Sequence, residues 1–348
     1  MRILNIDSMR LVPAFRALGH EVLSVGYEKE CDIQITSPRN AVSLYAQVCS
    51  TGFIPDCAFW CDASNLPYLP GIEELPCVTA FYSIDTYCHM WHFGFANAFD
   101  AVFVAQKDHL PFFPKDTVLV RWLPLFAPAL EESPPMEARD IPVSFVGTRQ
   151  HPNNPDRKPF LDGFRRAHPL VVYSGPYRDI FSRSRIVLNQ TACSEVNYRC
   201  FEALSCGTGL LMEICNHGLD ELFRPGETIL PLYARNNWAQ AAGIAANALA
   251  VPERLAEIAA NGRDLVARYH LARHRAEEVG AIFARLLAEK APMRRLRQLE
   301  TRRELLSAAY AMIGAGLTGR LPESYSKHYF AMSGKLTPDA PDTAEDAA

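Results

Sequence analysis

The 348-residue sequence lacks several features that would each assign it to a class of protein. Its longest alanine-rich stretch, residues 239–251, is too short to span a bilayer and contains Gln240 and Asn247. The N-terminus, MRILNIDSMR, has too short an apolar part for an export signal. The ten cysteines include no C-x-x-C pair, which excludes zinc-ribbon and thioredoxin-type motifs. We therefore expect a cytoplasmic protein whose cysteines are reduced, buried apolar residues.

The sequence also lacks an excess of positive charge. Its 35 lysines and arginines against 39 aspartates and glutamates give a net charge of −4, so the charge does not favour nucleic acid as the main partner. With 49% hydrophobic and 21% charged residues, the composition is that of an ordinary globular protein. The length is typical of two domains.

Residues 1–126 predict a Rossmann-like α/β domain. Short apolar runs alternate with helical or irregular segments, which is typical of a mostly parallel sheet covered on both faces. Strands are expected at residues 3–6, 21–25, 57–60, 78–82, 101–105 and 118–123. No G-x-G-x-x-G follows the first of them, so we expect no dinucleotide site in residues 1–30.

Residues 127–142 are rich in proline and glutamate and predict an exposed linker. Residues 143–290 predict a second Rossmann-like domain. We expect its strands at 143–146, 170–173, 186–189, 210–212 and 229–232, and its first helices at 157–167, 177–184, 198–205 and 218–223. The chain is then mainly helical, with a C-terminal extension at 291–336 and a disordered tail at 337–348. Because ligands bind beyond the carboxyl ends of strands in open α/β sheets, two facing sheets would line one cleft.

The most specific stretch is residues 185–227, where a strand leads through a loop to a helix that carries Asn197, Tyr198, Arg199 and Glu202. Arg199 and Glu202 are three positions apart and share a helix face. A helix N-terminus binds phosphate through its free N–H groups, and Arg199 can hold phosphate oxygens bidentately. One turn further on, Glu202 can accept hydrogen bonds from two vicinal hydroxyls. The spacing predicts a site for diphosphate and ribose or, alternatively, an ordinary surface ion pair.

This stretch also resembles a known family. The segment RCFEALSCG at 199–207, with GLDELFRPGE at 218–227, is similar to the donor-binding half of group 1 glycosyltransferases. It is most similar to the branch named after the spore maturation protein CgeB. The segments SFVG at 144–147 and RIVLN at 185–189 fit the earlier strands of that domain. The resemblance covers about residues 141–285.

The resemblance implies a GT-B fold, in which two Rossmann-like domains face each other and the C-terminal one binds a nucleotide-sugar donor. It assigns ribose binding to Glu202 and diphosphate contact to Arg199 and its neighbours, in an enzyme of bacterial glycan biosynthesis. One departure matters. Many retaining members carry two glutamates eight positions apart, whereas Ser194 stands eight positions before Glu202, with Glu195 beside it. Retention or inversion at the anomeric carbon therefore stays open.

A second candidate for phosphate contact is the turn Gly147-Thr148-Arg149, which follows the first strand of the second domain. Glycine there lets the backbone approach a phosphate, and Arg149 or Lys158 can neutralise its charge. The alternative is an ordinary strand–helix turn with solvated basic residues. The sequence has no D-x-D, the usual metal-holding motif of the other main glycosyltransferase fold. We therefore expect no metal and no cofactor, since arginine and helix N-termini can stabilise the diphosphate instead.

The catalytic candidates are Asp85, Asp62 and His89, in the N-terminal domain. Both aspartates follow predicted strands, and transfer to a hydroxyl needs a base or a group that holds the acceptor. Asp85 is preferred because sugar-stacking and hydrogen-bonding side chains surround it in the sequence: Tyr82, Tyr87, His89, Trp91 and His92. Alternatively, both aspartates cap the following helices. The two histidines would need a third ligand to hold a metal, so we expect them in the core or at an acceptor site.

The last predicted helix, 293–313, combines an apolar stripe with basic residues at Arg294, Arg295, Arg297, Arg302 and Arg303. The pattern predicts a basic surface that contacts an anionic membrane or a partner or, alternatively, a packed helix whose basic side faces solvent.

These observations predict a glycosyltransferase that moves a sugar from a nucleotide-sugar donor to a glycan, a lipid-linked saccharide or a protein. It would act in the cytoplasm or at the inner face of the membrane. Two alternatives stay open: a GT-B-type nucleotide-sugar epimerase, and a non-catalytic two-lobed protein that binds a nucleotide or sugar. The pair Arg199 and Glu202 favours a nucleotide over a free sugar, and the segment 81–92 favours a separate acceptor.

Overall fold

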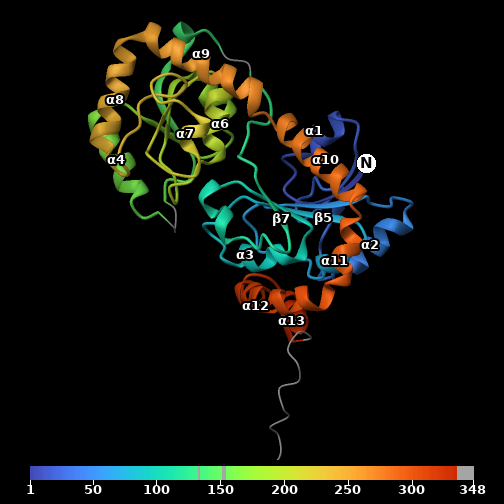
Figure 1. The fold of residues 1–348 in the computed structure, drawn as a ribbon. Helices are drawn as coiled ribbons and strands as arrows, with labels where there is room; N and C mark the ends of the chain where they lie inside the picture. The colour runs from blue at the N-terminus through green and yellow to red at the C-terminus, as the bar shows by residue number, and fades with distance from the viewer. Residues whose placement is uncertain (132–133, 151–153, 335–348) are drawn as a thin grey trace, which may run out of the picture. The chain divides into compact units, whose positions relative to one another are not determined.

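The computed structural model describes residues 1–131, 134–150 and 154–334, in two compact units (Figure 1). Unit 1 comprises residues 1–105 and 109–123 together with the C-terminal helices from Ala276 onward. Unit 2 comprises residues 106–108 and 124–275. Unit 1 thus includes residues 276–290, which the sequence placed in the second domain, and the extension that follows them. The predicted tail at 337–348 lies outside the described residues.

Unit 1 is built on a seven-stranded parallel sheet in the order β3-β2-β1-β4-β5-β6-β7. The strands are β1 (Arg2–Asp7), β2 (Glu21–Gly26), β3 (Ile33–Gln34), β4 (Cys57–Cys61), β5 (Val78–Ser83), β6 (Ala101–Val104) and β7 (Leu119–Trp122). Every residue of β4, β5 and β6 is buried. These strands form continuous apolar runs because helices cover both faces of a parallel sheet. Six of the seven strands were predicted, and the two-residue β3 was not.

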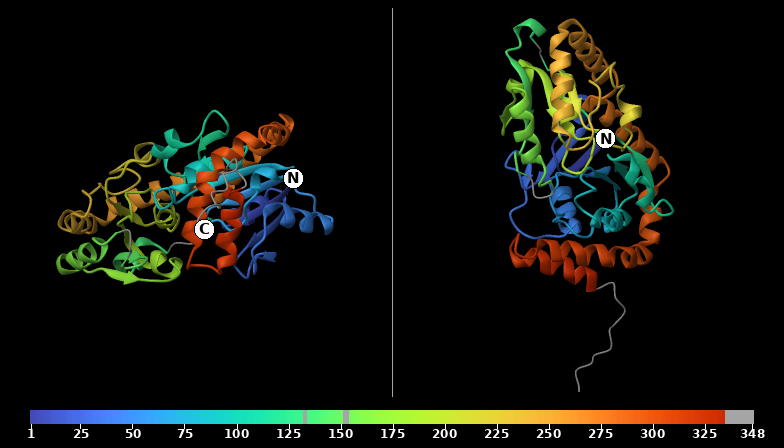
Figure 2. Two further views of the ribbon diagram at one scale, coloured as in Figure 1. Left: turned by 90° about the horizontal axis from the view of Figure 1, so that it is seen from below. Right: turned by 90° about the vertical axis from the view of Figure 1, so that its left-hand side faces the viewer.

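The helices of unit 1 come from both ends of the sequence. The N-terminal ones are α1 (Val12–Ala17), α2 (Ala41–Ser50) and α3 (Trp91–Phe95), with short 3-10 turns at Ile72–Glu74, Ala96–Ala98 and Lys107–Phe112. The C-terminal ones are α10 (Ala272–Ala288), which starts in unit 2, α11 (Ala291–Arg297), α12 (Leu299–Leu317) and α13 (Glu323–Gly334). Helix α12 packs against α13 and α3 (Figures 1 and 2). The single helix expected at 293–313 is therefore two helices, and α13 was not predicted.

Two arginines of the C-terminal helices lie inside unit 1 rather than on a basic surface. Arg295 is fully buried, forms an ion pair with Asp100, and donates to the carbonyl oxygens of Glu73 (3.1 Å) and Cys77 (3.0 Å). Arg302 donates to carbonyls of Asn97, Phe99 and Thr117 at 3.0, 2.8 and 2.6 Å. These carbonyls precede β5, β6 and β7, so they have no partner in the hydrogen-bond ladder of the sheet. A guanidinium can bind several of them at once because it has five N–H donors. The predicted basic face thus loses two of its five members.

Unit 2 has a four-stranded parallel sheet in the order β11-β10-β8-β9. Its strands are β8 (Ile141–Val146), β9 (Val171–Tyr173), β10 (Ser184–Asn189) and β11 (Gly209–Met212), and its helices are α4 (Arg157–Ala167), α5 (Arg178–Arg183), α6 (Tyr198–Ser205), α7 (Leu219–Leu222), α8 (Trp238–Ala250) and α9 (Pro252–Tyr269). The strand expected at 229–232 is absent. Ile229 and Leu230 are buried core residues, and the N–H of Leu230 donates to the carbonyl of Leu210 in β11 at 2.9 Å. The segment forms no regular ladder: Ile229 makes an isolated bridge with Pro225, and Tyr233, just after the segment, makes one with Glu213.

The predicted linker, 127–142, is partly ordered structure. Ala127 forms a bridge with Leu271, and a 3-10 turn spans Met136–Ala138. Strand β8 begins at Ile141, two residues before the strand expected from residue 143, whereas residues 132–133 lie outside the described part. Among the described residues, no helix has both the length and the apolar character that a membrane span requires.

Candidate functional site

Arg199 lies at the carboxyl end of the unit 2 sheet, on the first turn of α6. Its Nε donates to the carbonyl of Val146 at the end of β8 (2.8 Å), and its Nη1 to Oδ1 of Asn189 at the end of β10 (2.6 Å). The guanidinium also lies over the ring of Phe145, 4.6 Å from its centroid. Burial lowers the pKa of Arg199, although nearby Glu202 opposes that shift. The side chain is thus fixed by two strand ends, which leaves Nη2 without a hydrogen bond among the described residues.

Gly147 explains how Arg199 reaches this position. Its φ of 151° belongs to the region that L residues rarely adopt, and a Cβ there would lie 2.5 Å from Nη2 of Arg199. Only glycine leaves room for the guanidinium against the backbone that follows β8. The predicted glycine and the predicted arginine are therefore in contact, and the free edge of Arg199 faces the turn after β8.

A second guanidinium, that of Arg157, was missed in the sequence. It is 4% exposed, lies 5.7 Å from the centroid of the same Phe145 ring, and donates from Nη1 to the carbonyl of Thr148 (3.2 Å). Its Nε and Nη2 donate to the side chain and the backbone of Gln190 at 3.0 and 3.2 Å. Arg157 therefore ties the turn after β8 to the turn after β10. Two cations within cation–π distance of one ring give this edge a positive potential.

The other predicted residues of α6 have different surroundings. Asn197 forms an amide–amide pair with Asn189, in which each Nδ2 donates to the other Oδ1 (3.2 and 3.3 Å). The ring of Tyr198 packs edge-on against Phe126, with centroids 5.4 Å apart. Glu202 is 8% exposed, and its charge is among the causes that raise the pKa of Tyr177, after burial. Tyr177 follows β9, so the structure places Glu202 toward the turn between β9 and α5.

Arg149 and Lys158 do not join the arginine site. Nη2 of Arg149 and Nζ of Lys158 bind the two carboxylate oxygens of Asp162 at 2.6 and 2.9 Å. The hydrogen bond from Lys158, and then that from Arg149, lower the pKa of Asp162. Lys158 and Asp162 are four positions apart on α4, so they share its solvent side. In this conformation, both predicted phosphate contacts are paired with a carboxylate at the surface.

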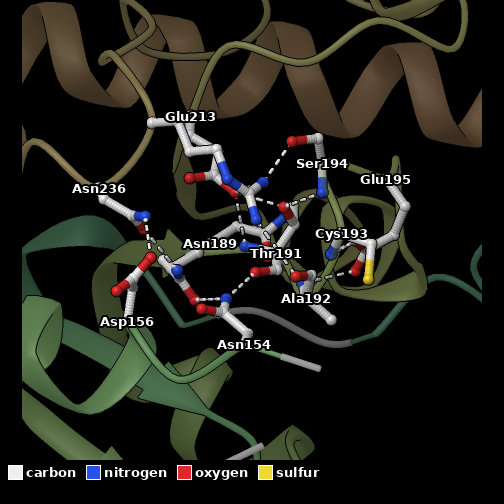
Figure 3. Close-up of polar contacts among 12 residues, drawn as sticks. Asn154, Asp156, Asn189, Thr191, Ala192, Cys193, Ser194, Glu195, Glu213 and Asn236 are labelled. Carbon is white, nitrogen blue, oxygen red and sulfur yellow. Dashed lines mark hydrogen bonds and ion pairs between the residues drawn. The ribbon is translucent and has the colours of Figure 1, made fainter. Parts of the chain in front are cut away.

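The loop between β10 and α6 folds around two buried glutamates (Figure 3). Glu195 is 3% exposed and accepts hydrogen bonds from the N–H groups of Ala192 (3.0 Å) and Cys193 (2.6 Å). Glu213, which follows β11, accepts from the N–H and hydroxyl of Thr191, the former at 3.0 Å. Glu195 follows Ser194, the residue eight positions before Glu202. Its hydrogen bonds to Ala192 and Cys193 hold the loop in which it lies.

A third arginine completes the positive edge. Arg235 pairs with Glu213 (3.4 Å) and donates to the hydroxyl of Ser194 and the carbonyl of Ala192, the latter at 3.2 Å. Its side chain is 37% exposed, so it also reaches solvent. Ser194 itself adopts a left-handed conformation with φ of 63°. Arg235 thus holds Ser194, the residue that stands eight positions before Glu202.

Amide side chains join this loop to the start of α4 (Figure 3). Nδ2 of Asn154 donates to the side chain of Gln190 (3.0 Å) and to the carbonyl of Thr191 (2.5 Å). Asn236 accepts from Gln190 (2.9 Å) and donates to Asp156 (3.0 Å). Because these partners come from three separate segments, the network fixes the loops around Arg157 and Arg235 relative to one another.

Carboxylates occupy the carboxyl end of the unit 1 sheet. Asp62, after β4, is almost fully buried and accepts from the N–H groups of Ser64 (2.8 Å), Ile84 (3.1 Å) and Asp85 (2.8 Å). Burial, followed by the charge of Asp85, raises the pKa of Asp62 to about 7. Asp85, after β5, is half-buried and accepts from the hydroxyl of Tyr87 at 2.7 Å. The two predicted aspartates are therefore neighbours, and Asp85 is the more accessible of the two.

Asp7, at the end of β1, is a third carboxylate that the sequence did not single out. It has a left-handed φ of 71° and accepts from the N–H of Ala63 (3.2 Å) and from Nδ2 of Asn65 (3.4 Å). Burial raises the pKa of Asp7 to about 6. Its position directly after an apolar strand was the available signal, since β1 and β4 are adjacent in the sheet.

The two histidines near Asp85 differ in role. His92 is fully buried, with Nδ1 2.7 Å from the hydroxyl of Ser83 and Nε2 3.8 Å from Oδ2 of Asp62. Burial holds its pKa well below the usual range, so it is a neutral core residue. His89 is half-buried, with Nε2 3.3 Å from the carbonyl of Ser64, and burial lowers its pKa too. Of the two, only His89 borders a cavity.

Comparisons with known proteins identify the fold. The sequence model of a family described as glycosyl transferase-like matches residues 130–281. The crystal structure of Alr3699/HepE from Anabaena in complex with UDP-glucose has a TM-score of 0.61 at 11% identity, and the match covers 82% of this chain and 100% of that one. Sucrose-phosphate synthase from Thermosynechococcus elongatus has a TM-score of 0.58 at 13% identity, with 83% and 100% covered.

A glycosyltransferase from Rickettsia africae has a TM-score of 0.60 at 10% identity, with 82% of this chain and 98% of that one covered. No curated protein sequence matches the chain. At such low identities, the structural likeness establishes the fold and leaves the chemistry to the site. The fold is the GT-B fold of these glycosyltransferases, as the resemblance implied.

Proposed function

We propose that this chain, which carries a glycosyl transferase-like domain in a GT-B fold, transfers a sugar from a nucleoside diphosphate sugar to an acceptor hydroxyl. The donor binds at the carboxyl end of the unit 2 sheet, and the acceptor at that of the unit 1 sheet. Within group 1 glycosyltransferases, the segment RCFEALSCG at 199–207 supports membership of the CgeB-like branch.

The observation that carries the proposal is the guanidinium of Arg199 held against Gly147. Its Nε and Nη1 donate to the ends of two strands, so the guanidinium is fixed in place. The remaining nitrogen, Nη2, lies beside Gly147, which has no side chain to cover it. Arg157 and Arg235 add positive charge at the same sheet edge. Diphosphate is the part of a nucleotide sugar that such a preorganised set of cations binds best.

The neighbouring structures support the choice of donor, since HepE has been solved with UDP and with UDP-glucose. Glu202 would accept hydrogen bonds from the two ribose hydroxyls, with Tyr177 beside it at the turn after β9. The arginines supply the positive charge that a metal supplies elsewhere, so we propose that the donor binds without a divalent cation.

In the transfer, the acceptor oxygen forms a bond to the anomeric carbon, and the bond from that carbon to the diphosphate oxygen breaks. The diphosphate leaves with the electron pair, next to the arginines that stabilise its charge. The proton of the acceptor hydroxyl goes to a carboxylate, for which Asp85 is the accessible candidate and Asp62 the buried one behind it.

The acceptor is a glycan, a lipid-linked saccharide or a protein. Peripheral contact with the inner face of a membrane through the C-terminal helices also stays a proposal. It is less well supported than the sequence suggested, since Arg295 and Arg302 are internal and Arg303 pairs with Glu74 at 2.7 Å.

Calorimetry tests the donor site directly. Wild-type protein is titrated with UDP, GDP, TDP and CMP in the presence of a chelator and then with magnesium or manganese. We expect one nucleoside diphosphate to bind in chelator, and its sugar to bind as well. Binding that needs the added metal would contradict the metal-independent site, and no binding of any nucleotide would contradict the proposed function.

A further inference from the structure

A cavity of 260 Å³ in unit 1 adjoins the carboxylates at the ends of β1, β4 and β5. One group of lining residues follows strands of the sheet: Tyr27, Ser64, Asn65, Leu66 and His89. The other group comes from the end of α12 and the turn after it: Leu317, Arg320 and Leu321. Segments more than two hundred positions apart in the sequence therefore form one cavity.

The strand-side wall of the cavity is bonded to the aspartates. The N–H of Ser64 donates to Oδ1 of Asp62 at 2.8 Å, and Nδ2 of Asn65 lies 3.4 Å from Oδ1 of Asp7. His89 closes the wall through its contact with the carbonyl of Ser64. A molecule in the cavity would therefore lie one residue away from the carboxylates proposed for proton transfer.

The helix-side wall supplies the charge and the apolar surface. Among the described residues that line the cavity, Arg320 carries the only permanent charge, and it is exposed and forms no ion pair within the described part of the chain. Leu66 packs against Gly316 of α12, where an added Cβ would lie 3.2 Å from its methyl groups. The cavity thus combines a free guanidinium with leucine side chains, next to hydrogen-bonding groups at Asn65 and His89.

We propose that this cavity binds the acceptor, and that Arg320 selects an acceptor sugar that carries a carboxylate or a phosphate. The volume is just below the range of drug-sized sites, which suits one sugar ring. The guanidinium pairs with the anionic group, and the leucines contact the apolar face of the ring. The inference rests on the proposed function. It assigns acceptor choice to the end of α12 and the turn after it, which lie outside residues 130–281.

The test measures binding of three probes to the full chain saturated with UDP: D-glucuronate, D-glucose 6-phosphate and D-glucose. We expect wild-type protein to bind at least one of the anionic probes fivefold or more tightly than glucose. The anionic probe that binds more tightly shows whether Arg320 prefers a carboxylate or a phosphate. Arg320→Gln is expected to remove the preference, and the control Arg297→Gln, an exposed arginine of α11 outside the cavity, to keep it.

A second variant tests the cavity itself. Leu321→Trp adds bulk to the lining and is expected to lower binding of all three probes at least fivefold with UDP affinity unchanged. Equal affinities for the three probes, no binding of any of them, or a preference that survives Arg320→Gln would each overturn the inference. Because UDP is titrated separately, its normal binding in these cases leaves the proposed function standing, whereas a wild type that binds none of the four nucleotides contradicts that function.

Discussion

The carboxyl ends of the two parallel sheets differ in the charged groups that they hold. In unit 1, Asp7, Asp62 and Asp85 follow three adjacent strands, and burial raises the pKa values of the first two. In unit 2, the corresponding edge holds the guanidiniums of Arg199 and Arg157, and burial lowers the pKa of Arg199. One architecture therefore provides two chemistries: carboxylates that can take up a proton near neutral pH, and cations that can stabilise a leaving diphosphate.

The two edges share the way in which the charged groups are held. Asp62 accepts three backbone N–H groups from the turns after β4 and β5, and Arg199 donates to the backbone and side chain at the ends of β8 and β10. In both cases the strand ends fix the charge, so little reorganisation is needed when a ligand arrives. The accessible group, Asp85 or Nη2 of Arg199, is then the one that we expect to act.

The largest expected effect separates the roles of the two edges. Asp85→Asn keeps the size of the side chain but cannot take up the proton, so transfer is expected to fall at least a hundredfold, within the usual 10²–10⁴-fold range for a general base. Affinity for the nucleoside diphosphate is expected to stay at the wild-type level. The measurement is nucleoside diphosphate release from the donor, together with calorimetry of the same variant.

Asp62→Asn is the matched comparison, because Asp62 lies next to Asp85 but is buried. If Asp85→Asn transfers at the wild-type rate while Asp62→Asn is inactive, the base is Asp62. If both variants remain fully active, the base lies elsewhere or the donor diphosphate accepts the proton.

The second prediction concerns the arginine edge. Arg199→Gln removes a charge-assisted contact to the diphosphate and is expected to weaken donor binding by about 1.5–3 kcal/mol. Lys158→Gln is the matched control, since Lys158 is paired with Asp162 at the surface and is expected to change binding by less than about 0.5 kcal/mol. Calorimetry with equal losses for the two variants would mean that the edge acts only through its overall charge.

The third prediction is that Glu202→Ala weakens donor binding by about 1–3 kcal/mol, the usual effect of leaving polar partners unpaired. The loss is expected with UDP, and not with inorganic pyrophosphate, because Glu202 is assigned to the ribose. An equal loss with both ligands would place Glu202 at the diphosphate instead, beside Arg199.

Local pattern predicted most of the scaffold. Helices 157–167 and 198–205 were predicted with the boundaries that the structure has, because their apolar spacing is clear and glycine, proline or polar turns flank them. The strand at 229–232 was wrong for a reason that local pattern cannot reveal. Leu230 packs in the core of unit 2 and its N–H donates to the carbonyl of Leu210 in the edge strand β11 at 2.9 Å, but the segment forms only isolated bridges and no regular ladder.

Side-chain pairing was the harder part of the site. Gly147, Arg199 and Asn197 do meet at one sheet edge, as their positions after predicted strands suggested. Arg149 and Lys158 were indistinguishable in sequence from Arg157, and only the fold decides which cation is buried and which is paired with Asp162. Arg295 and Arg302 were assigned to a surface because most of their partners are carbonyl groups, which every residue has and no sequence pattern marks.

The last prediction is a pH dependence that the two edges should not share. Asp7 and Asp62 have folded-state pKa values of about 6 and about 7 against 3.8 for an ordinary aspartate. Between those limits the folded protein keeps protons that the unfolded chain has released. The free energy of unfolding is therefore expected to fall as pH rises from 5 to 8, by up to about 1.4 kcal/mol per pH unit for each group.

Asp62→Asn removes one of these protons, so its free energy of unfolding should fall less steeply over that range. The change is measured by urea unfolding at several pH values, with the fluorescence of Trp60 and Trp91 in unit 1 as the signal. Asp162→Asn is the control from the arginine side. The pKa of Asp162 is lowered, so its contribution to the free energy of unfolding is lost only as pH drops below the ordinary aspartate pKa. The slope of this variant between pH 5 and 8 should therefore match that of wild type. Equal slopes for wild type and Asp62→Asn would mean that Asp62 is ionised throughout. The acidic edge would then carry its charge as permanently as the arginine edge, and proton uptake would be left to Asp85 alone.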